Sequence, residues 1–263
     1  SFGAGSDDGW LIKTDVDGNK QWEQTFGGNE DDGFSFVQQT TDNGYILAGH
    51  TPSFGAGSDD GWLIKTDVDG SMLWEQEFGG SELDRFRSVQ QTIDEGYILA
   101  GYTESSGAGR YDGLLVKTDG NGSKQWEQTF GGSNDDELSS VQQTTDGGYV
   151  LAGVKYSEAG SSDGWFIKTD ADGNKQWEQT FGGTDYNYIF SLQQTTDEGY
   201  ILAGMAEYTG DHEVRSSEGW LIKTDANGSM LWEQKFGGSE NDNFHSVQQT
   251  TDGDYILAGY TES

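Results

Sequence analysis

The chain has 263 residues, 46 of them acidic and 14 basic, and a formal net charge of −32. This field repels nucleic acid and anionic membranes, and it suits cations, basic partners or a salty medium. There is no cysteine and no apolar run of about 18 residues, which excludes disulfides, thiolate metal sites and a membrane-spanning helix. The chain begins with Ser1 and shows no signal peptide, so we interpret it as a processed or excised piece.

Four short strand-like segments follow one another and recur along the chain. Gly9–Asp15 reads GWLIKTD, and Gln21–Gly28 reads QWEQTFGG. The next two types are SVQQT, as in Ser88–Thr92, and YILAG, as in Tyr45–Gly49. They are rich in β-branched and aromatic residues, as strands are. Asp-Asn-Gly and Asp-x-Asp/Asn-Gly sequences between them predict tight hairpins.

The repeat is about 52 residues long and occurs five times, which accounts for the whole chain. The chain begins with the third and fourth segments of a unit and ends with the first and second, Ser246–Gly259. An open stack would need caps and would expose sheet edges, whereas a ring joins the two halves. We therefore predict an all-β fold: a five-bladed β-propeller with four antiparallel strands per blade, closed by a blade shared between the N- and C-terminal halves.

We expect a single domain over residues 1–263, with the SVQQT-type strand innermost in each blade and the QWEQTFGG strand outermost. The innermost strands carry paired glutamines, which either line the axis or hydrogen-bond the next blade. The half-blade 1–28 is completed by 244–263, and full blades cover approximately 34–80, 86–132, 138–183 and 189–238.

The pattern WLIKTDxxGxxxWEQxFGG, followed by SVQQTxDxGYILAG, resembles the β-propeller repeats of secreted and cell-surface proteins of bacteria and archaea. Trp22, four residues after Gly18, also gives a partial likeness to the Trp-docking repeat of quinoprotein propellers. That family is eight-bladed and its spacing before the glycine is one residue longer, so no quinone cofactor is carried over. The first resemblance implies an extracellular location and a role in binding or spacing, and it supplies no catalytic residues.

The loops between second and third strands should share one face with the connections between blades. They differ from blade to blade, whereas the turns at the other face are nearly uniform. Loops vary at little cost to packing, so ligand binding is expected where near-identical units diverge; the alternative is drift in tolerant loops. The candidate ligand-binding residues are Tyr102, Arg110, Tyr111, Tyr156, Tyr208, His212 and Arg215.

Two acidic positions recur on the same face, one before the third strand and one after the Gly-Gly of the fourth. Neighbouring carboxylates offer the oxygen ligands that Ca²⁺ takes. Alternatively, each aspartate accepts hydrogen bonds from backbone amides of the adjoining turn. Asn187 replaces the aspartate in one blade and weakens the metal interpretation there. The candidate calcium ligands are Asp8, Asp32, Asp60, Asp84, Asp112, Asp136, Asp163 and Asp242.

Catalysis needs one site with two unlike groups whose pKa values are tuned apart. The three histidines, His50, His212 and His245, have no sequence context for a triad or a zinc site. We predict a non-catalytic extracellular module that binds a glycan or a protein at the cell surface, with calcium the one cofactor in question. The alternative is a structural spacer or a self-associating surface-layer or fibre subunit, because near-identical blades are expected where geometry is selected. A glycoside hydrolase is the weakest alternative.

Overall fold

A computed structural model describes residues 7–157, 160–209 and 215–262. These residues form 20 β-strands, and every pair of neighbouring strands in a sheet is antiparallel. Within this described part, no helix is long and apolar enough to cross a membrane. The chain divides into two compact units, Ser1–Phe130 and Gly131–Ser263, which we call unit 1 and unit 2.

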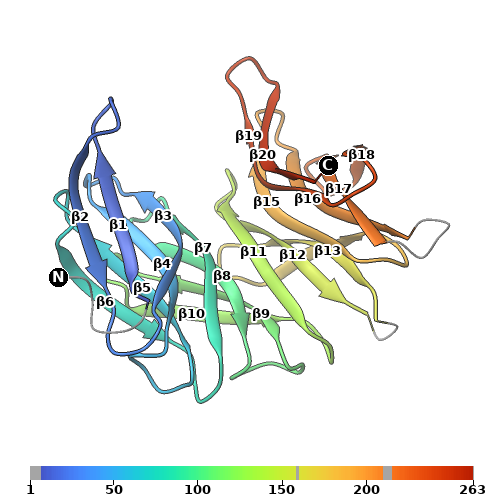
Figure 1. Cartoon of the computed structure of the whole chain (residues 1–263). Helices are drawn as coiled ribbons and strands as arrows, with labels where there is room; N and C mark the ends of the chain where they lie inside the picture. Colours follow the sequence, from blue (N-terminus) through green and yellow to red (C-terminus); the bar gives the residue numbers. More distant parts are fainter. Residues whose placement is uncertain (1–6, 158–159, 210–214, 263) are drawn as a thin grey trace. The chain divides into compact units, whose positions relative to one another are not determined.

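Unit 1 holds one two-stranded sheet and two four-stranded sheets (Figure 1, blue to green). In each four-stranded sheet the strands lie side by side in chain order. The strands are β1 (Gly9–Thr14) and β2 (Lys20–Phe26); β3 (Gly33–Gln39), β4 (Tyr45–Thr51), β5 (Asp60–Thr66) and β6 (Met72–Phe78); β7 (Asp84–Gln91), β8 (Tyr97–Thr103), β9 (Asp112–Thr118) and β10 (Lys124–Phe130).

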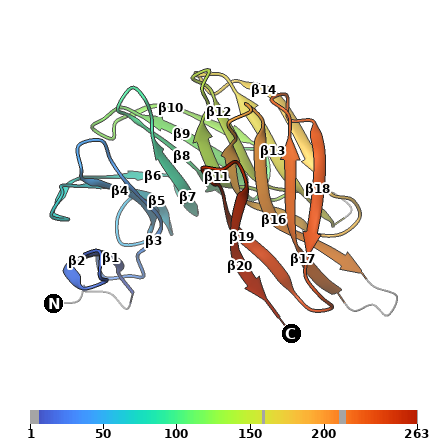
Figure 2. The ribbon, with the colours of Figure 1, turned by 90° about the horizontal axis from the view of Figure 1, so that it is seen from above.

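Unit 2 repeats this arrangement with the two-stranded sheet at its other end in sequence (Figure 2, yellow-green to red). In each four-stranded sheet the inner strand is the SVQQT-type segment, and the outer strand is the QWEQTF-type segment. The strands are β11 (Asp136–Gln143), β12 (Tyr149–Tyr156), β13 (Ser162–Thr169) and β14 (Lys175–Phe181); β15 (Asn187–Gln194), β16 (Tyr200–Thr209), β17 (Arg215–Thr224) and β18 (Met230–Phe236); β19 (Asp242–Gln249) and β20 (Tyr255–Thr261).

Two kinds of tight turn connect the strands. After an inner strand, Asn43 adopts a φ of 68°, and the amide of Gly44 donates a hydrogen bond of 3.0 Å to Asp42. After a third strand, Asp15 accepts hydrogen bonds of 2.9 Å from the backbone amides of Asp17 and Asn19. The turn glycines that follow have φ near 80°, as Gly70 does at 79°, where a side chain is strained. The aspartates and glycines of the repeat are therefore turn residues, as predicted.

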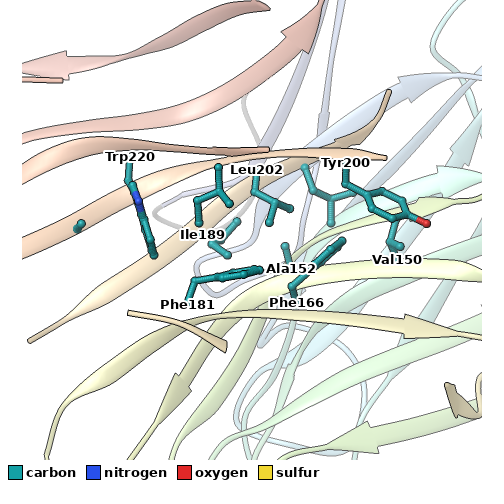
Figure 3. Packing of buried hydrophobic residues seen from close by; sticks show 11 residues of the cluster. Val150, Ala152, Phe166, Phe181, Ile189, Tyr200, Leu202 and Trp220 are labelled. Atoms are coloured by element: carbon teal, nitrogen blue, oxygen red, sulfur yellow. The ribbon is translucent and has the colours of Figure 1, made fainter. Parts of the chain in front are cut away.

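The sheets of each unit stack face to face, and their apolar side chains fill the space between them. In unit 2, Val150 and Phe166 of one sheet pack against Ile189, Leu202 and other residues of the next (Figure 3). A separate cluster lies on the other face of the second sheet, where Ile201 and its neighbours pack against β19–β20. Because both faces are covered, the YILAG strand is apolar at successive positions instead of alternating.

The paired glutamines join one inner strand to the next. The side-chain oxygen of Gln38 accepts a hydrogen bond of 2.8 Å from the amide of Gln91 in the neighbouring sheet. In return, the amide of Thr41 donates a bond of 2.9 Å to the side chain of Gln91. In these sheets the glutamines hydrogen-bond the next sheet, one of the two predicted roles. In unit 2 the same contact joins Gln142 to Gln194 and Gln193 to Gln249.

The predicted all-β architecture of repeated four-stranded antiparallel sheets is confirmed. The remaining two sheets, β1–β2 and β19–β20, are two-stranded. Among the strands that the structure describes, β1 pairs with β2 alone and β20 with β19 alone. β1 and β20 therefore each have a free edge where the equivalent strands of the four-stranded sheets, such as β5 and β4, are paired on both sides.

Candidate binding site

The connections between sheets lie against the loops between second and third strands. The amide of Glu30 donates a hydrogen bond of 3.0 Å to Ser53, and that of Glu82 donates one of 3.1 Å to Ser105. Both kinds of loop therefore occupy the same end of the sheets, as expected. We call it the loop end; in unit 1 it includes residues 52–59 and 79–83.

Each inner strand has a β-bulge close to the loop end. The pairing with the second strand shifts around one extra residue in each of the five described inner strands, β3, β7, β11, β15 and β19. Such an extra residue is unpaired, and the bulge bends the strand and re-aims the side chain. The bulge residue is a serine in two sheets and a large residue of different chemistry in the other three. These residues are Ser35, Arg87, Ser139, Phe190 and His245.

In unit 1, charged side chains gather around the bulge of β7. The guanidinium of Arg85 pairs with the carboxylate of Asp59, whose residue is 4% exposed. His50 at the end of β4 lies beside Gly33, where a Cβ would stand 3.2 Å from the imidazole Cε1. Gly33 occupies the position that Arg85 has in the next sheet, so the missing side chain leaves the space that the imidazole fills.

Burial and neighbouring charges set the protonation of this cluster. Burial lowers the pKa of His50, and the positive charges of Arg85 and Arg87 lower it further against the opposing effect of Asp59. Burial raises the pKa of Asp59, against the opposing effects of His50 and Arg85. The imidazole is therefore uncharged at neutral pH, and the fixed positive charges belong to the two arginines.

Three of the predicted ligand-binding residues are brought together beside this cluster. The guanidinium of Arg87 lies 5.3 Å from the ring centroid of Tyr102. The rings of Tyr102 and Tyr111 meet edge to face at 5.3 Å, and Arg110 lies 4.7 Å from the Tyr111 ring. Arg110 also donates a hydrogen bond of 2.9 Å to Glu104. Tyr102 is 6% exposed, so its ring packs under Arg87 and Tyr111 and is not itself accessible to a ligand.

In unit 2, aromatic rings occupy the equivalent positions. The hydroxyls of Tyr156 and Tyr188 hydrogen-bond at 2.6 Å, and burial and this bond raise the pKa of Tyr156. Tyr188 stacks on Phe190 with centroids 6.0 Å apart and planes 9° apart. His245 lies 5.2 Å from Phe190 and 6.0 Å from Tyr260. The five rings form one continuous row along β12, β15, β19 and β20, and sequence reasoning selected Tyr156 alone among them.

The aspartates after the Gly-Gly pairs are buried and accept hydrogen bonds from backbone amides. Asp32 accepts one of 2.7 Å from Gly28, and its oxygens also accept bonds from the hydroxyls of Thr51 and Ser53. The same backbone bond, at 2.8 to 2.9 Å, is made to Asp84, Asp136 and Asp242.

The aspartates before the third strands lie against the same glycines. A Cβ at Gly79 would stand 2.3 Å from Asp60 Oδ1 and 2.5 Å from Asp84 Oδ2, so this glycine separates two carboxylates. Asp60 accepts hydrogen bonds from the amides of Ala56 and Gly57 at 2.8 and 2.9 Å. Asp112 accepts the equivalent bonds from the amides of its own loop. Asp8 and Asp32 lie against Gly27 in the same way, as do Asp163 and Asn187 against Gly182.

Backbone amides are thus the observed partners of several of the acidic positions. Among the residues that the structure describes, no three or more acidic, histidine or cysteine side chains are grouped so that they could hold a metal ion. Calcium at these aspartates stays a prediction.

Three predicted ligand-binding residues cannot be placed as side chains. His212 lies outside the described residues. Tyr208 and Arg215 are described as backbone only, where Tyr208 pairs with Ser216 and Arg215 with Thr209.

Sequence reasoning missed Arg85, Arg87, Tyr188 and Phe190 because it treated the inner strands as uniform. Aligning these strands on their glutamine pairs would have exposed two variable positions before the repeated part. The five segments read GFSFVQQ, RFRSVQQ, ELSSVQQ, YIFSLQQ and NFHSVQQ.

No known protein-family model matches the chain. It is similar to the regulatory protein FlaEY of Caulobacter vibrioides, with 25% identity over 259 residues that cover 89% of this chain and 26% of the relative's length. Among solved structures it is similar to the WD40 domain of Neurospora crassa Pan2, at a TM-score of 0.59 and 11% identity, over 94% of this chain and 67% of that one. A protein of unknown function from Bacteroides caccae gives a TM-score of 0.51 and 11% identity, over 89% and 80% of the two chains. The fold is β-propeller-like. At such identities the solved structures show the fold alone.

Proposed function

We propose that the chain is a non-catalytic binding module that works outside the cell and takes a glycan or protein ligand at the loop end. The observation that carries this proposal is the chemistry of the bulge positions. The frame repeats closely from sheet to sheet, while the bulge residue changes from serine to arginine, phenylalanine or histidine. Binding surfaces are built this way, from variable side chains on a rigid scaffold.

The chemistry of the unit 1 cluster favours binding over catalysis. Asp59 is engaged by Arg85, and a guanidinium does not exchange its proton in the working range of an enzyme. The carboxylate of Asp59 is therefore not free to act together with His50. The two groups do not form a general acid and a general base with separated pKa values. The acidic composition and the resemblance to secreted propeller repeats support a location outside the cell.

The proposal includes a closed five-bladed ring, in which β20 pairs with β1 and the two half-sheets make the fifth blade. Exposed fractions support the pairing. Trp10 on β1 is 59% exposed, whereas its equivalent Trp62 is 1% exposed. Ile256 on β20 is 60% exposed, whereas its equivalent Ile46 is fully buried. The register of β4 with β5 would place Gly259 opposite Trp10.

A repeated ion pair supports the same closure. In every four-stranded sheet, the buried lysine of the third strand pairs with the aspartate of the turn after the inner strand. Lys13 and Asp252 are the equivalent residues of the two half-sheets, and closure would bring them together. The four complete pairs are Lys65–Asp42, Lys117–Asp94, Lys168–Asp146 and Lys223–Asp197, at 2.9 to 3.1 Å.

A repeated ring contact gives a third, independent argument. The outer-strand tryptophan of one sheet packs on the turn glycine of the next, so that a Cβ at Gly70 would lie 2.7 Å from the Trp22 ring. Gly122 has the same relation to Trp74 at 2.6 Å. Gly18 has no atom within 4 Å of the equivalent position, and Trp232 is its counterpart on the outer strand of the preceding blade. Closure would supply this contact.

A self-assembling spacer is the second candidate function. The unpaired edges of β1 and β20 favour it, because β20 of one copy could complete the half-sheet of another. Sedimentation at increasing concentration separates the two: the binding module in a closed ring stays monomeric, and the spacer forms larger species.

The binding proposal is tested on a glycan array and in a protein pull-down. The informative variant combines Arg87→Ser, Phe190→Ser and His245→Ser, because serine is the bulge residue of two sheets already. Asp17→Asn, at the opposite end of the sheet, is the control, since asparagine occupies that turn position at Asn121 and Asn227. We expect the triple variant to lose at least tenfold in affinity and the control to bind as the wild type does. A wild type that binds nothing, or a triple variant that binds equally well, contradicts the proposal.

A further inference from the structure

We propose that Arg87 binds the single carboxylate of an acidic saccharide, with Tyr111 and Arg110 beside it at the loop end of unit 1. The inference rests on the proposed binding function and names its ligand class.

Arg87 differs from the two arginines near it. Arg85 pairs with Asp59, and Arg110 pairs with Glu104. Arg87 is exposed, and the structure gives it no acidic partner among the described residues. Although the chain has 46 acidic residues, no ion pair of Arg87 is found among the described residues, so its guanidinium is available to an external carboxylate. Arginine recognises carboxylates, as it does phosphates, through two parallel hydrogen bonds.

The surroundings hold this guanidinium in place. Arg87 is the bulge residue of β7, and its guanidinium lies over the ring of the buried Tyr102. A cation over an aromatic face is attracted to it and keeps its N–H groups at the edge of the plane. At the start of the same strand, the carboxylate of Asp59 is already engaged in the ion pair with Arg85. The site is therefore arranged before a ligand arrives, which lowers the entropy cost of binding.

Neighbouring groups suit a sugar ring. Tyr111 is partly exposed, and its ring meets that of Tyr102, on which Arg87 lies, edge to face. Arg110 lies 4.7 Å from the Tyr111 ring, so an aromatic ring and a second guanidinium are linked to Arg87 through Tyr102. Glu104, which accepts a hydrogen bond from Arg110, also has acceptor capacity for hydroxyl donors. A ligand with one carboxylate, several hydroxyls and a flat apolar face matches this set.

The net charge of −32 selects against ligands with many negative charges. Each additional carboxylate or phosphate of a polyanion meets the negative field of the whole molecule, while a single carboxylate meets the local guanidinium. An acidic peptide, nucleic acid or sulfated polymer is therefore a poorer ligand than a saccharide with one acidic residue.

The test measures binding of four probes by calorimetry: an oligosaccharide ending in glucuronic acid, the same oligosaccharide ending in glucose, heparin, and a hexaglutamate peptide. The variants are Arg87→Ser and, as a control with the same loss of charge, Lys124→Ser at an exposed site of β10. We expect the glucuronate probe to bind at least tenfold more tightly than the glucose probe. Arg87→Ser should remove that difference, and Lys124→Ser should change it less than twofold.

Three outcomes overturn the inference. The acidic and neutral oligosaccharides bind the wild type equally well, the Arg87→Ser variant binds the glucuronate probe as tightly as the wild type does, or heparin or hexaglutamate binds more tightly than the glucuronate probe. Failure of this inference and failure of the proposed function remain distinguishable. If the chain binds neutral glycans or proteins and loses them in Phe190→Ser or His245→Ser, the binding function stands and the acidic saccharide does not. If the wild type binds no glycan and no protein, both fall.

Discussion

Trp10 gives a direct test of the pairing between β1 and β20. In a closed ring its side chain takes the environment of Trp62, so its exposed fraction falls from 59% to about 1%. A tryptophan buries roughly 150–250 Å², so closure would bury on the order of 100 Å² more of this side chain. At about 25 cal/mol per Å² this corresponds to about 2–4 kcal/mol of the free energy of unfolding.

The perturbation is Trp10→Ala, compared with Trp62→Ala. Truncating a buried tryptophan costs about 3–5 kcal/mol, because the lost transfer energy and the remaining cavity add. In a closed ring the two variants should lose similar stability. With β1 at an open edge, Trp10→Ala should lose no more than about half as much as Trp62→Ala, since less than half of its surface is buried.

The assay is urea denaturation followed by far-UV circular dichroism, with the slope and midpoint fitted for each variant. Val16→Ala is the control, because Val16 is fully exposed in the turn after β1 and should change stability by less than about 0.5 kcal/mol. A loss for Trp10→Ala of less than half that for Trp62→Ala, with unchanged slopes, would refute the closed pairing.

Three further predictions follow from single contacts. The pair Leu11→Cys and Ala258→Cys should form an intramolecular disulfide on oxidation, seen as a faster-migrating monomer on a non-reducing gel; covalent dimers would indicate pairing between copies instead. Gly79→Ala should lower the melting temperature by several degrees, because its Cβ would lie 2.3 Å from a carboxylate oxygen. Gly132→Ala is the control, since a Cβ there would have no atom within 4 Å. Equal melting temperatures of the two variants would contradict this prediction. Hydrogen bonds lower the pKa of Asp42 from 3.8 to about 2, so the stabilisation by its carboxylate is present above about pH 4 and is lost as the pH falls towards 2. Asp42→Asn should flatten this part of a stability–pH profile, and an unchanged profile would count against this role of Asp42.

The strands and turns were predictable because each depends on local sequence. The Asp-x-Asp/Asn-Gly turns form through bonds within five residues, as Asp15 does with Asn19. The order of strands in a sheet also followed, since strands that are consecutive in the chain were expected to pair as neighbours. The role of the first glycine in the Gly-Gly pair did not follow. Gly79 separates Asp60 from Asp84, which belong to different sheets, and this arrangement exists only after the sheets stack.

The candidate site was predicted in part, and the missing part has a physical reason. Arg110 and Tyr111 lie on the loop between β8 and β9, and Tyr102 lies near the end of β8, so all three belong to the sequence segment that diverges between the repeats. Arg85 meets Asp59 across 26 residues and from a neighbouring sheet, and Arg87 is aimed by a bulge that the strand pattern does not announce. Contacts of this kind depend on register and stacking, which sequence periodicity does not specify.

The bulge also explains how a nearly uniform frame can carry side chains of different chemistry at one position. Residues before and after the bulge have fixed structural roles. In β7, Phe86 is fully buried in the core, and the amide of Gln91 donates a hydrogen bond to Gln38 of the preceding sheet. The bulge residue between them has no partner in the strand ladder, so its side chain can change without disturbing either contact. Serine at Ser35 and Ser139 shows that the backbone accepts a small residue there, and Phe190 shows that it accepts a large one. The side chain at this position can therefore change one sheet at a time, while the packing that holds the sheets together stays the same in each repeat.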